Sequence, residues 1–156
     1  MSANTKAAAD VITEYVTVLI ADQLFGLPIG RVQDVFMPER LTRVPLASAE
    51  IAGVLNLRGR IVTAIDMRCR LGSPPRDQNR PPMAVEIEFH GESYGLLIDT
   101  AGEVLKLADD TLEANPVNLD KRLAGVSAGV HRLDGQLLVV LDVDRVLEIG
   151  AAAVAA

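Results

Sequence analysis

Few residues in this sequence have the types and the spacing that catalysis requires. The two histidines, His90 and His131, share no motif spacing with a serine, a cysteine or a carboxylate, so a pair of nucleophile and base has little support. The single Cys69 cannot form an intramolecular disulfide, and one cysteine with two distant histidines gives no metal-ligand spacing. The sequence also has no glycine-rich phosphate loop and no paired-cysteine zinc motif. We therefore expect no catalysis, no metal and no cofactor.

The arginine of an Arg-Gly pair is the more informative chemical group. Arg58 and Gly59 lie between the apolar runs 51–55 and 61–65, where Gly59 can supply the positive φ of a tight hairpin turn. A guanidinium group binds a carboxylate through two parallel N–H bonds. Two interpretations stay open: Arg58 contacts a carbonyl or an acid across a junction within the chain, or it binds a carboxylate of a partner, with Leu57 and other apolar side chains around it.

Composition excludes two classes of partner. The 156 residues carry a net charge of −6, no tryptophan and only five phenylalanine and tyrosine residues together. Nucleic acids and anionic membranes recruit basic or aromatic surfaces, which this chain lacks. We expect no nucleic acid partner and no direct membrane insertion. The lone cysteine and the absence of a signal-peptide pattern near the N-terminus favour a cytoplasmic location.

Hairpin patterns dominate the chain. Three pairs of β-branched or aromatic runs flank short turns, and we expect all-β structure with short helices. Asp66 is expected to cap a short helix over 67–71 that ends at Gly72. The runs of the three hairpins are 15–20 with 24–29, 83–89 with 93–98, and 130–133 with 137–141.

The two halves of the chain repeat one another. Residues 25–29 match 94–98 at an offset of 69, and residues 57–66 match 133–142 at an offset of 76. We also align 51–54 with 123–126, at an offset of 72, and expect the insertions near 115–118. Short strands in two copies favour two small closed barrels, side by side, because closure removes exposed edges.

The repeat divides the chain into two halves and shows which residues occur at equivalent positions in both. Asp66 and Asp142 match, so they are interpreted as helix caps rather than paired catalytic acids. Arg58 matches Asp134, which suits a primed turn better, so the arginine is the asymmetric residue. The expected segments are a flexible 1–13, a first barrel 14–72, a connector 73–82, a second barrel 83–150 and a flexible tail 151–156, with the N-terminal strand able to pair in either barrel.

These motifs resemble the CheW family of chemotaxis coupling proteins, from Glu14 to Gly150. The resemblance lies in the hairpin 25–29 with the segment 32–35, in Gly53-Val54 followed by 56–59 and the strand to Asp66, and in 123–126 with 141–142. It implies one CheW-like domain of two five-stranded SH3-like barrels and a non-catalytic scaffold. It also implies two partners, the regulatory domain of a CheA-type histidine kinase and the cytoplasmic tip of chemoreceptors. Such a protein is monomeric alone, forms arrays with its partners and is recruited to membrane-associated receptor arrays.

The resemblance supplies the two partners, and the repeat and the pattern of apolar and charged residues select a candidate site for each. We expect the receptor to bind in a groove between the barrels marked by the Asn-Leu-Arg-Gly motif, namely Asn56, Leu57, Arg58 and Gly59. We expect the kinase to bind at Gln33, Asp34, Val35 and Arg43. For this second site the interpretation that Val35 is core and Asp34 merely solvated has equal weight.

Two other functions stay open at this point. The same fold could serve a related signalling system that controls surface motility or a second messenger. A double barrel that binds a small ligand or a nucleic acid is a further alternative, although it would require a basic or aromatic face.

Overall fold

The computed structural model describes residues 11–148, which form strands and short helical segments. The strands are β1 (Ile12–Ile20), β2 (Gln23–Pro28), β3 (Val32–Phe36), β4 (Ile51–Leu57), β5 (Arg60–Asp66), β6 (Met83–Phe89), β7 (Glu92–Ile98), β8 (Thr100–Ala108), β9 (Ser127–Leu133) and β10 (Gln136–Leu141). The helical segments are the 3-10 turns η1 (Ile29–Arg31) and η2 (Asp109–Thr111), the helices α2 (Met67–Arg70) and α3 (Lys121–Val126), and residues 143–148.

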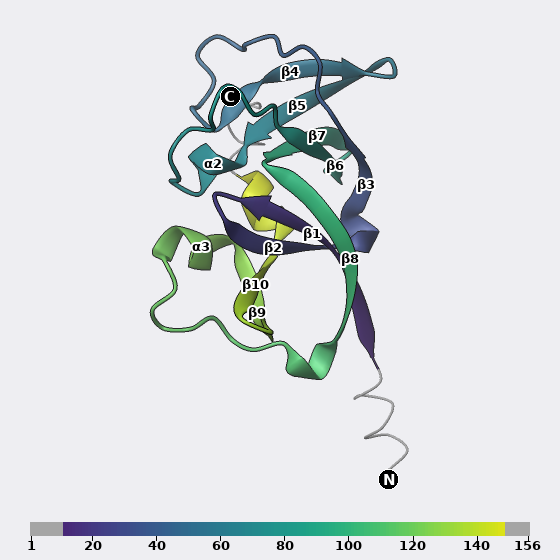
Figure 1. Cartoon of the computed structure of the whole chain (residues 1–156). Helices are drawn as coiled ribbons and strands as arrows, with labels where there is room; N and C mark the ends of the chain where they lie inside the picture. The colour runs from purple at the N-terminus through teal and green to yellow at the C-terminus, as the bar shows by residue number, and fades with distance from the viewer. Residues whose placement is uncertain (1–10, 149–156) are drawn as a thin grey trace.

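The strands form two five-stranded sheets, which confirms the predicted fold class. One sheet has the order β3-β6-β7-β5-β4, and we call it the middle barrel because it uses the middle of the chain. The other has the order β8-β1-β2-β10-β9, and we call it the terminal barrel because it uses both ends. Figure 1 shows the middle barrel above the terminal barrel, with α2 at the level where they meet.

Each sheet is closed by the segment that follows its edge strand. After β3 the chain returns to β4, where Thr42 and Val54 exchange two backbone hydrogen bonds of 2.8 Å. After β8 it returns to β9, where Glu113 and Val130 exchange bonds of 2.8 and 2.9 Å. These bridges occupy backbone groups that an open sheet would expose at its edges.

The strands are not divided at the proline-rich connector. In the terminal barrel β2 lies beside β10, and in the middle barrel β5 lies beside β7, so each half of the chain gives a hairpin to the other half's sheet. Both contacts are parallel, with Leu138 opposite Leu24 and Val62 opposite Ser93. The expected division into 14–72 and 83–150 is therefore corrected. Of the two options for the N-terminal strand, β1 pairs in the terminal barrel. It begins at Ile12, so the expected flexible segment 1–13 is wrong for residues 12 and 13, while residues 1–10 and the tail 151–156 lie outside the described residues.

The internal repeat is confirmed, but one of its alignments is wrong. Gly53 and Gly129 occupy equivalent bridges at φ of 152° and 143°, and a Cβ atom there would lie 2.6 Å from the Thr42 oxygen and 2.8 Å from the Glu113 oxygen. Backbone contact of this kind requires glycine. The partner of Gly53 is therefore Gly129, at an offset of 76, whereas Gly125 lies in α3.

The largest hydrophobic cluster contains side chains from both barrels. Val16, Val18 and Phe25 of the terminal barrel belong to the same buried cluster as Val85 and Ile87 of the middle barrel. Smaller clusters occur inside each barrel. Burial of each such aliphatic or aromatic side chain contributes about 1.5–3 kcal/mol, so the barrels stabilise one another through their common core.

Both predicted helix caps are confirmed. The Asp66 carboxylate accepts a hydrogen bond from Cys69 N at 3.2 Å, and the matching Asp142 carboxylate accepts one from Arg145 N at 3.3 Å. Gly72 follows α2 at a φ of 73°, and its N–H donates to the Cys69 carbonyl at 3.1 Å. The first helix therefore ends where the sequence predicts.

The terminal barrel contains a buried histidine, His131, at the position where the middle barrel has Leu55. His131 is 1% exposed, and its ring packs edge-on against Tyr15 with centroids 5.6 Å apart. The Thr111 hydroxyl donates to the Ala108 carbonyl at 2.8 Å, so at 3.0 Å it accepts from His131 Nδ1. Nε2 is buried and has no hydrogen-bond partner among the described residues. The geometry therefore assigns a neutral ring protonated at Nδ1.

Stability is expected to fall as the pH drops below about 6.5, because of His131. Burial lowers the pKa of His131 against the opposing effect of Asp109 and Glu113, so the unfolded chain takes up a proton first as the pH falls. Replacing His131 with leucine, the residue type found at the equivalent position 55, should flatten this dependence. Urea unfolding of both proteins at pH 7.5 and 5 measures it, and an unchanged slope in the variant would contradict the assignment.

Candidate functional site

The Asn-Leu-Arg-Gly motif forms the hairpin between β4 and β5. Arg58 and Gly59 are the turn residues, with φ of 53° and 83°, and the Asn56 side-chain oxygen accepts a hydrogen bond from Gly59 N at 2.9 Å. Leu57 is half-buried and packs against the core of the middle barrel. Three residues of the motif therefore build and anchor the turn, whereas the Arg58 side chain is 71% exposed.

The Arg58 backbone is in a conformation that arginine does not favour. A residue other than glycine, asparagine or aspartate in the left-handed region costs about 1–2 kcal/mol. In the equivalent turn of the terminal barrel φ is positive at Gly135 and not at Asp134. The repeat therefore permits a turn without this cost, whereas the hairpin between β6 and β7 accepts it at His90, with a φ of 52°. The turn geometry alone does not require an arginine at position 58.

An ion pair joins the two predicted sites. Arg58 Nη2 lies 3.1 Å from Asp34 Oδ2, and the Asp34 side chain is 27% exposed. This Oδ2 atom is buried and forms no hydrogen bond of good geometry, so its interaction with Arg58 is an ion pair only, while Oδ1 accepts from Val35 N at 2.8 Å. Arg58 does pair with an acid of its own chain, as one interpretation expected, but both residues belong to the middle barrel rather than to a junction between barrels.

A second pair extends the charge cluster. Arg60 Nη2 lies 2.8 Å from Glu86 Oε2, and Glu86 is only 1% exposed. Glu86 is the cross-strand neighbour of Asp34, so two arginines face two adjacent carboxylates. Glu86 alternates along β6 with the apolar residues Val85 and Ile87, a pattern that predicts a solvated strand face. That prediction is wrong here because this face of β6 points into a closed barrel, where Glu86 is buried.

The repeat provides an internal comparison for this cluster. The positions equivalent to Asp34, Glu86, Arg58 and Arg60 in the terminal barrel are Glu103, Thr17, Asp134 and Gln136. There the Thr17 hydroxyl donates to the Glu103 carbonyl at 2.6 Å, and none of the four is a cation. The fold therefore does not require the cluster, which is a property of the middle barrel alone.

The four candidate kinase residues do not share one environment. Gln33 and Arg43 are exposed, but Val35 is half-buried and packs against the core common to both barrels. Asp34 belongs to the ion pair with Arg58. Alternation places Asp34 and Val35 on opposite faces of β3. Gln33 is the extra residue at the register shift between Val32 and Asp34, and Arg43 lies beyond the strand.

Apolar surface lies next to the hairpin. A hollow of about 410 Å³ is lined in part by Phe36, Met37, Leu55 and Leu57. Met37 is 58% exposed, and Ile61, directly after Arg60, is 65% exposed. An exposed guanidinium beside open apolar side chains can bind an amphipathic partner. Sequence reasoning missed this hollow because its residues come from two separate segments.

Within residues 11–148, no helix is long and apolar enough to cross a membrane, and no group of three or more histidine, cysteine, aspartate or glutamate side chains is placed to hold a metal ion.

Comparison with known proteins identifies relatives that match most of the chain at 23–26% identity. Chemotaxis protein CheW of Thermotoga maritima is 26% identical over 145 residues, covering 92% of this chain and 94% of its own. Chemotaxis protein CheW of Helicobacter pylori is 23% identical over 137 residues, covering 88% and 82%. The crystal structure of the scaffolding protein TtCheW from Thermoanaerobacter tengcongensis matches with a TM-score of 0.79 and 25% identity, covering 88% of this chain and 89% of that one.

The family model called CheW-like domain matches residues 14–150, the range over which the sequence motifs indicated the resemblance. The relatives, the solved structure and the exchanged five-stranded sheets agree with this match. The chain therefore belongs to the CheW-like family.

Proposed function

We propose that this protein is a non-catalytic adaptor that couples chemoreceptors to a CheA-type histidine kinase in chemotaxis signalling. Membership of the family supports this role, as do the names of the relatives, which are chemotaxis proteins, and that of TtCheW, a scaffolding protein. The observation that carries the proposal is Arg58, an exposed guanidinium held in a costly turn conformation beside a hollow lined by both apolar and charged side chains.

Arg58 is the proposed contact for the receptor tip. An acidic side chain on a receptor helix would accept hydrogen bonds from the guanidinium, and apolar side chains of the same helix face would enter the hollow beside Leu57 and Met37. Asn56 and Gly59 hold the turn in shape. Because Arg58 already faces Asp34, the receptor carboxylate would share or replace an existing ion pair rather than order a free side chain.

The proposed kinase surface contains Gln33, Asp34, Val35 and Arg43. Exposed Gln33 and Arg43 are the direct contacts, and half-buried Val35 supports the strand from the core side. Asp34 belongs to both proposed surfaces through its pair with Arg58. Occupation of one surface is therefore expected to change the affinity of the other, by an equal factor in both directions.

The adaptor is proposed to act in the cytoplasm, at membrane-associated receptor arrays, as a monomer that assembles only with its partners. Its net charge of −6 disfavours a direct contact with anionic lipid.

A binding experiment with three purified proteins tests this function. The full chain is mixed with a soluble receptor-tip fragment and with the regulatory domain of the kinase, and complexes are measured by size-exclusion chromatography and calorimetry. We expect both binary complexes and a ternary complex. A single-stranded oligonucleotide serves as the control for nucleic acid binding, and we expect the chain not to bind it. Failure to bind either protein partner would overturn the proposal.

The Asp34→Arg variant tests the kinase surface in the same experiment. It places two arginines together and removes the carboxylate, so kinase binding should weaken at least tenfold. The matched control is Glu103→Arg, the equivalent position in the terminal barrel. Full retention of the kinase by the Asp34→Arg variant would remove this surface from the proposal.

A further inference from the structure

A basic pocket lies where the connector meets the junction of the two barrels. Its volume is about 520 Å³, within the range of roughly 300–1,000 Å³ typical of small-molecule sites. Three arginines and two aspartates contribute to it, so the formal charge of its lining is positive. The lining residues are Arg68, Arg76, Asp77, Asn79, Arg80, Pro81, Asp99 and Thr100.

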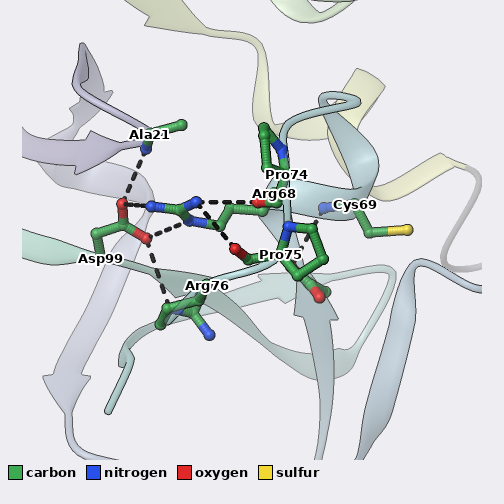
Figure 2. A network of polar contacts seen from close by, with 8 residues as sticks. Ala21, Arg68, Cys69, Pro74, Pro75, Arg76 and Asp99 are labelled. Atoms are coloured by element: carbon green, nitrogen blue, oxygen red, sulfur yellow. Dashed lines mark hydrogen bonds and ion pairs between the residues drawn. The ribbon is translucent and has the colours of Figure 1, made fainter. Parts of the chain in front are cut away.

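Asp99 has its hydrogen-bonding capacity largely used. Its carboxylate accepts from Arg68 Nε at 2.9 Å, from Arg68 Nη2 at 2.6 Å and from Ala21 N at 2.9 Å. Figure 2 shows this carboxylate between the Arg68 guanidinium and the Ala21 backbone, with Arg76 on the remaining side. All three nitrogens of Arg68 are also hydrogen-bonded, because its Nη1 donates to the Pro74 carbonyl at 2.9 Å.

Arg76 is left without sufficient counter-charge. Its side chain is 15% exposed, and its Nε lies 3.5 Å from Asp99 Oδ1, without the geometry of a hydrogen bond. Nε and Nη2 are both buried without a hydrogen-bond partner among the described residues. A guanidinium that has lost water on one side and has only a distant, shared carboxylate favours an anion on its open side.

Arg80 supplies a second cation at the same pocket. It is exposed, and it forms no ion pair with any residue in the range 11–148. A turn fixes its position, since Arg80 N donates to the Asp77 carbonyl at 3.0 Å and the Asp77 carboxylate accepts from Asn79 N at 2.9 Å. Arg76, which has only a distant ion pair, and Arg80, which has none, therefore line one hollow together with Asn79 and Thr100.

The equivalent place in the repeat has the opposite polarity. Arg68 matches Asp144 and Thr100 matches Arg31, and Arg31 Nη2 pairs with Asp144 Oδ1 at 2.9 Å. The pocket there is lined by Arg31, Glu88, Phe89, His90, Asp144 and Glu148, with three acids. The fold thus accepts either a positive or a negative net charge at this junction. The excess of arginine at the first pocket is therefore not required for the barrels to fold.

We propose that the pocket at Arg76 and Arg80 binds a small phosphate-bearing ligand. Guanidinium forks match the oxygens of a phosphate group, and the pocket has room for an organic part as well. A long nucleic acid is disfavoured by the net charge of −6, and the arginines are gathered at one hollow rather than along a basic surface strip. This binding is separate from the proposed adaptor function, because none of the lining residues belongs to the Arg58 hairpin or to the candidate kinase residues.

Amide chemical shifts of the full chain test the proposal. The protein is titrated with inorganic phosphate, adenosine monophosphate, adenosine and succinate at constant ionic strength. We expect saturable shifts at Asn79 and Thr100 with phosphate and with adenosine monophosphate, and none with adenosine. Tighter binding of the nucleotide assigns an organic phosphate, whereas equal affinities assign the free anion. Succinate binding as tight as phosphate, or no saturable binding of either phosphate compound, would overturn the proposal.

Two variants and a control locate the ligand. Arg76→Gln and Arg80→Ala should each weaken phosphate binding at least tenfold. Arg80→Ala removes no described ion pair, so it keeps the test valid even if Arg76→Gln disturbs the Asp99 network. Lys121→Ala, an exposed cation on α3 outside the pocket lining, should bind as the unmodified chain does. An unchanged affinity in the Arg80→Ala variant would exclude the site.

Discussion

Replacing Arg58 with alanine is expected to weaken binding of the receptor tip at least tenfold and to leave the free energy of unfolding nearly unchanged. Hydrogen bonds to charged groups contribute about 1.5–3 kcal/mol, and this arginine is the exposed donor of the site. Its own ion pair with Asp34 involves a side chain that is 71% exposed, so losing that pair costs at most about 1 kcal/mol. Calorimetric titration with a receptor fragment and urea unfolding measure the two effects.

Two further variants separate the turn from the side chain. Arg58→Asn gives the Asn-Gly pair that a primed turn prefers, so it should raise stability by about 1 kcal/mol while losing binding as alanine does. Asp134→Ala changes the equivalent turn of the terminal barrel and should bind the receptor normally. A large loss of stability with unchanged binding in Arg58→Ala would make the arginine a structural residue only.

Local features of this fold could be predicted from the sequence because short-range chemistry determines them. Asp66 and Gly72 bound α2 through contacts within six residues of one another, and the turn at Gly59 depends on the neighbouring Asn56. The choice of Arg58 came from comparing two halves of the same chain. It needed no knowledge of which strands pair.

The rest depended on contacts between distant segments. The exchange of hairpins rests on parallel pairs such as Val62 with Ser93, which no local pattern signals. Burial of Glu86 was missed for the same reason, because alternation cannot distinguish a solvated face from the inside of a barrel. The alignment of Gly53 with Gly125 is wrong because it rested on similar residue types at 51–54 and 123–126. Close backbone contact determines where glycine is required, and such contacts occur at Gly53 and Gly129.

Replacing Asp99 with asparagine is expected to lower the free energy of unfolding more than the changes at Arg58 or Asp144 do. Asp99 joins β7 of the middle barrel to β8 of the terminal barrel, and its pair with Arg68 involves side chains only 21% and 18% exposed. Asp99→Asn would leave Arg68 and Arg76 without their carboxylate, at a cost of about 2–3 kcal/mol after allowing for partial exposure. For a chain of this size the melting temperature should fall by roughly 5–10 °C.

The same pair predicts how stability changes in acid. The hydrogen bonds from Arg68, together with the Ala21 N–H and the charge of Arg76, lower the pKa of Asp99. Because its folded pKa lies below the unfolded value of about 4, the stabilisation is complete above that pH and is lost as the pH falls through the folded value. Urea unfolding between pH 7 and 3 should therefore show a smaller acid loss in the Asp99→Asn variant than in the unmodified chain.

The reversed pair of the repeat is the matched control. Asp144, equivalent to Arg68, pairs with Arg31, which lies one position after the residue equivalent to Asp99, but their side chains are 59% and 36% exposed. Water screens such a pair, so Asp144→Asn should cost about 0.5 kcal/mol or less. Equal losses in the two variants would mean that both pairs act as surface charges and that the common hydrophobic core alone holds the barrels together. A loss confined to Asp99→Asn identifies the carboxylate of Asp99, which accepts from Arg68 after β5 and from Ala21 N after β1, as a second attachment between the barrels.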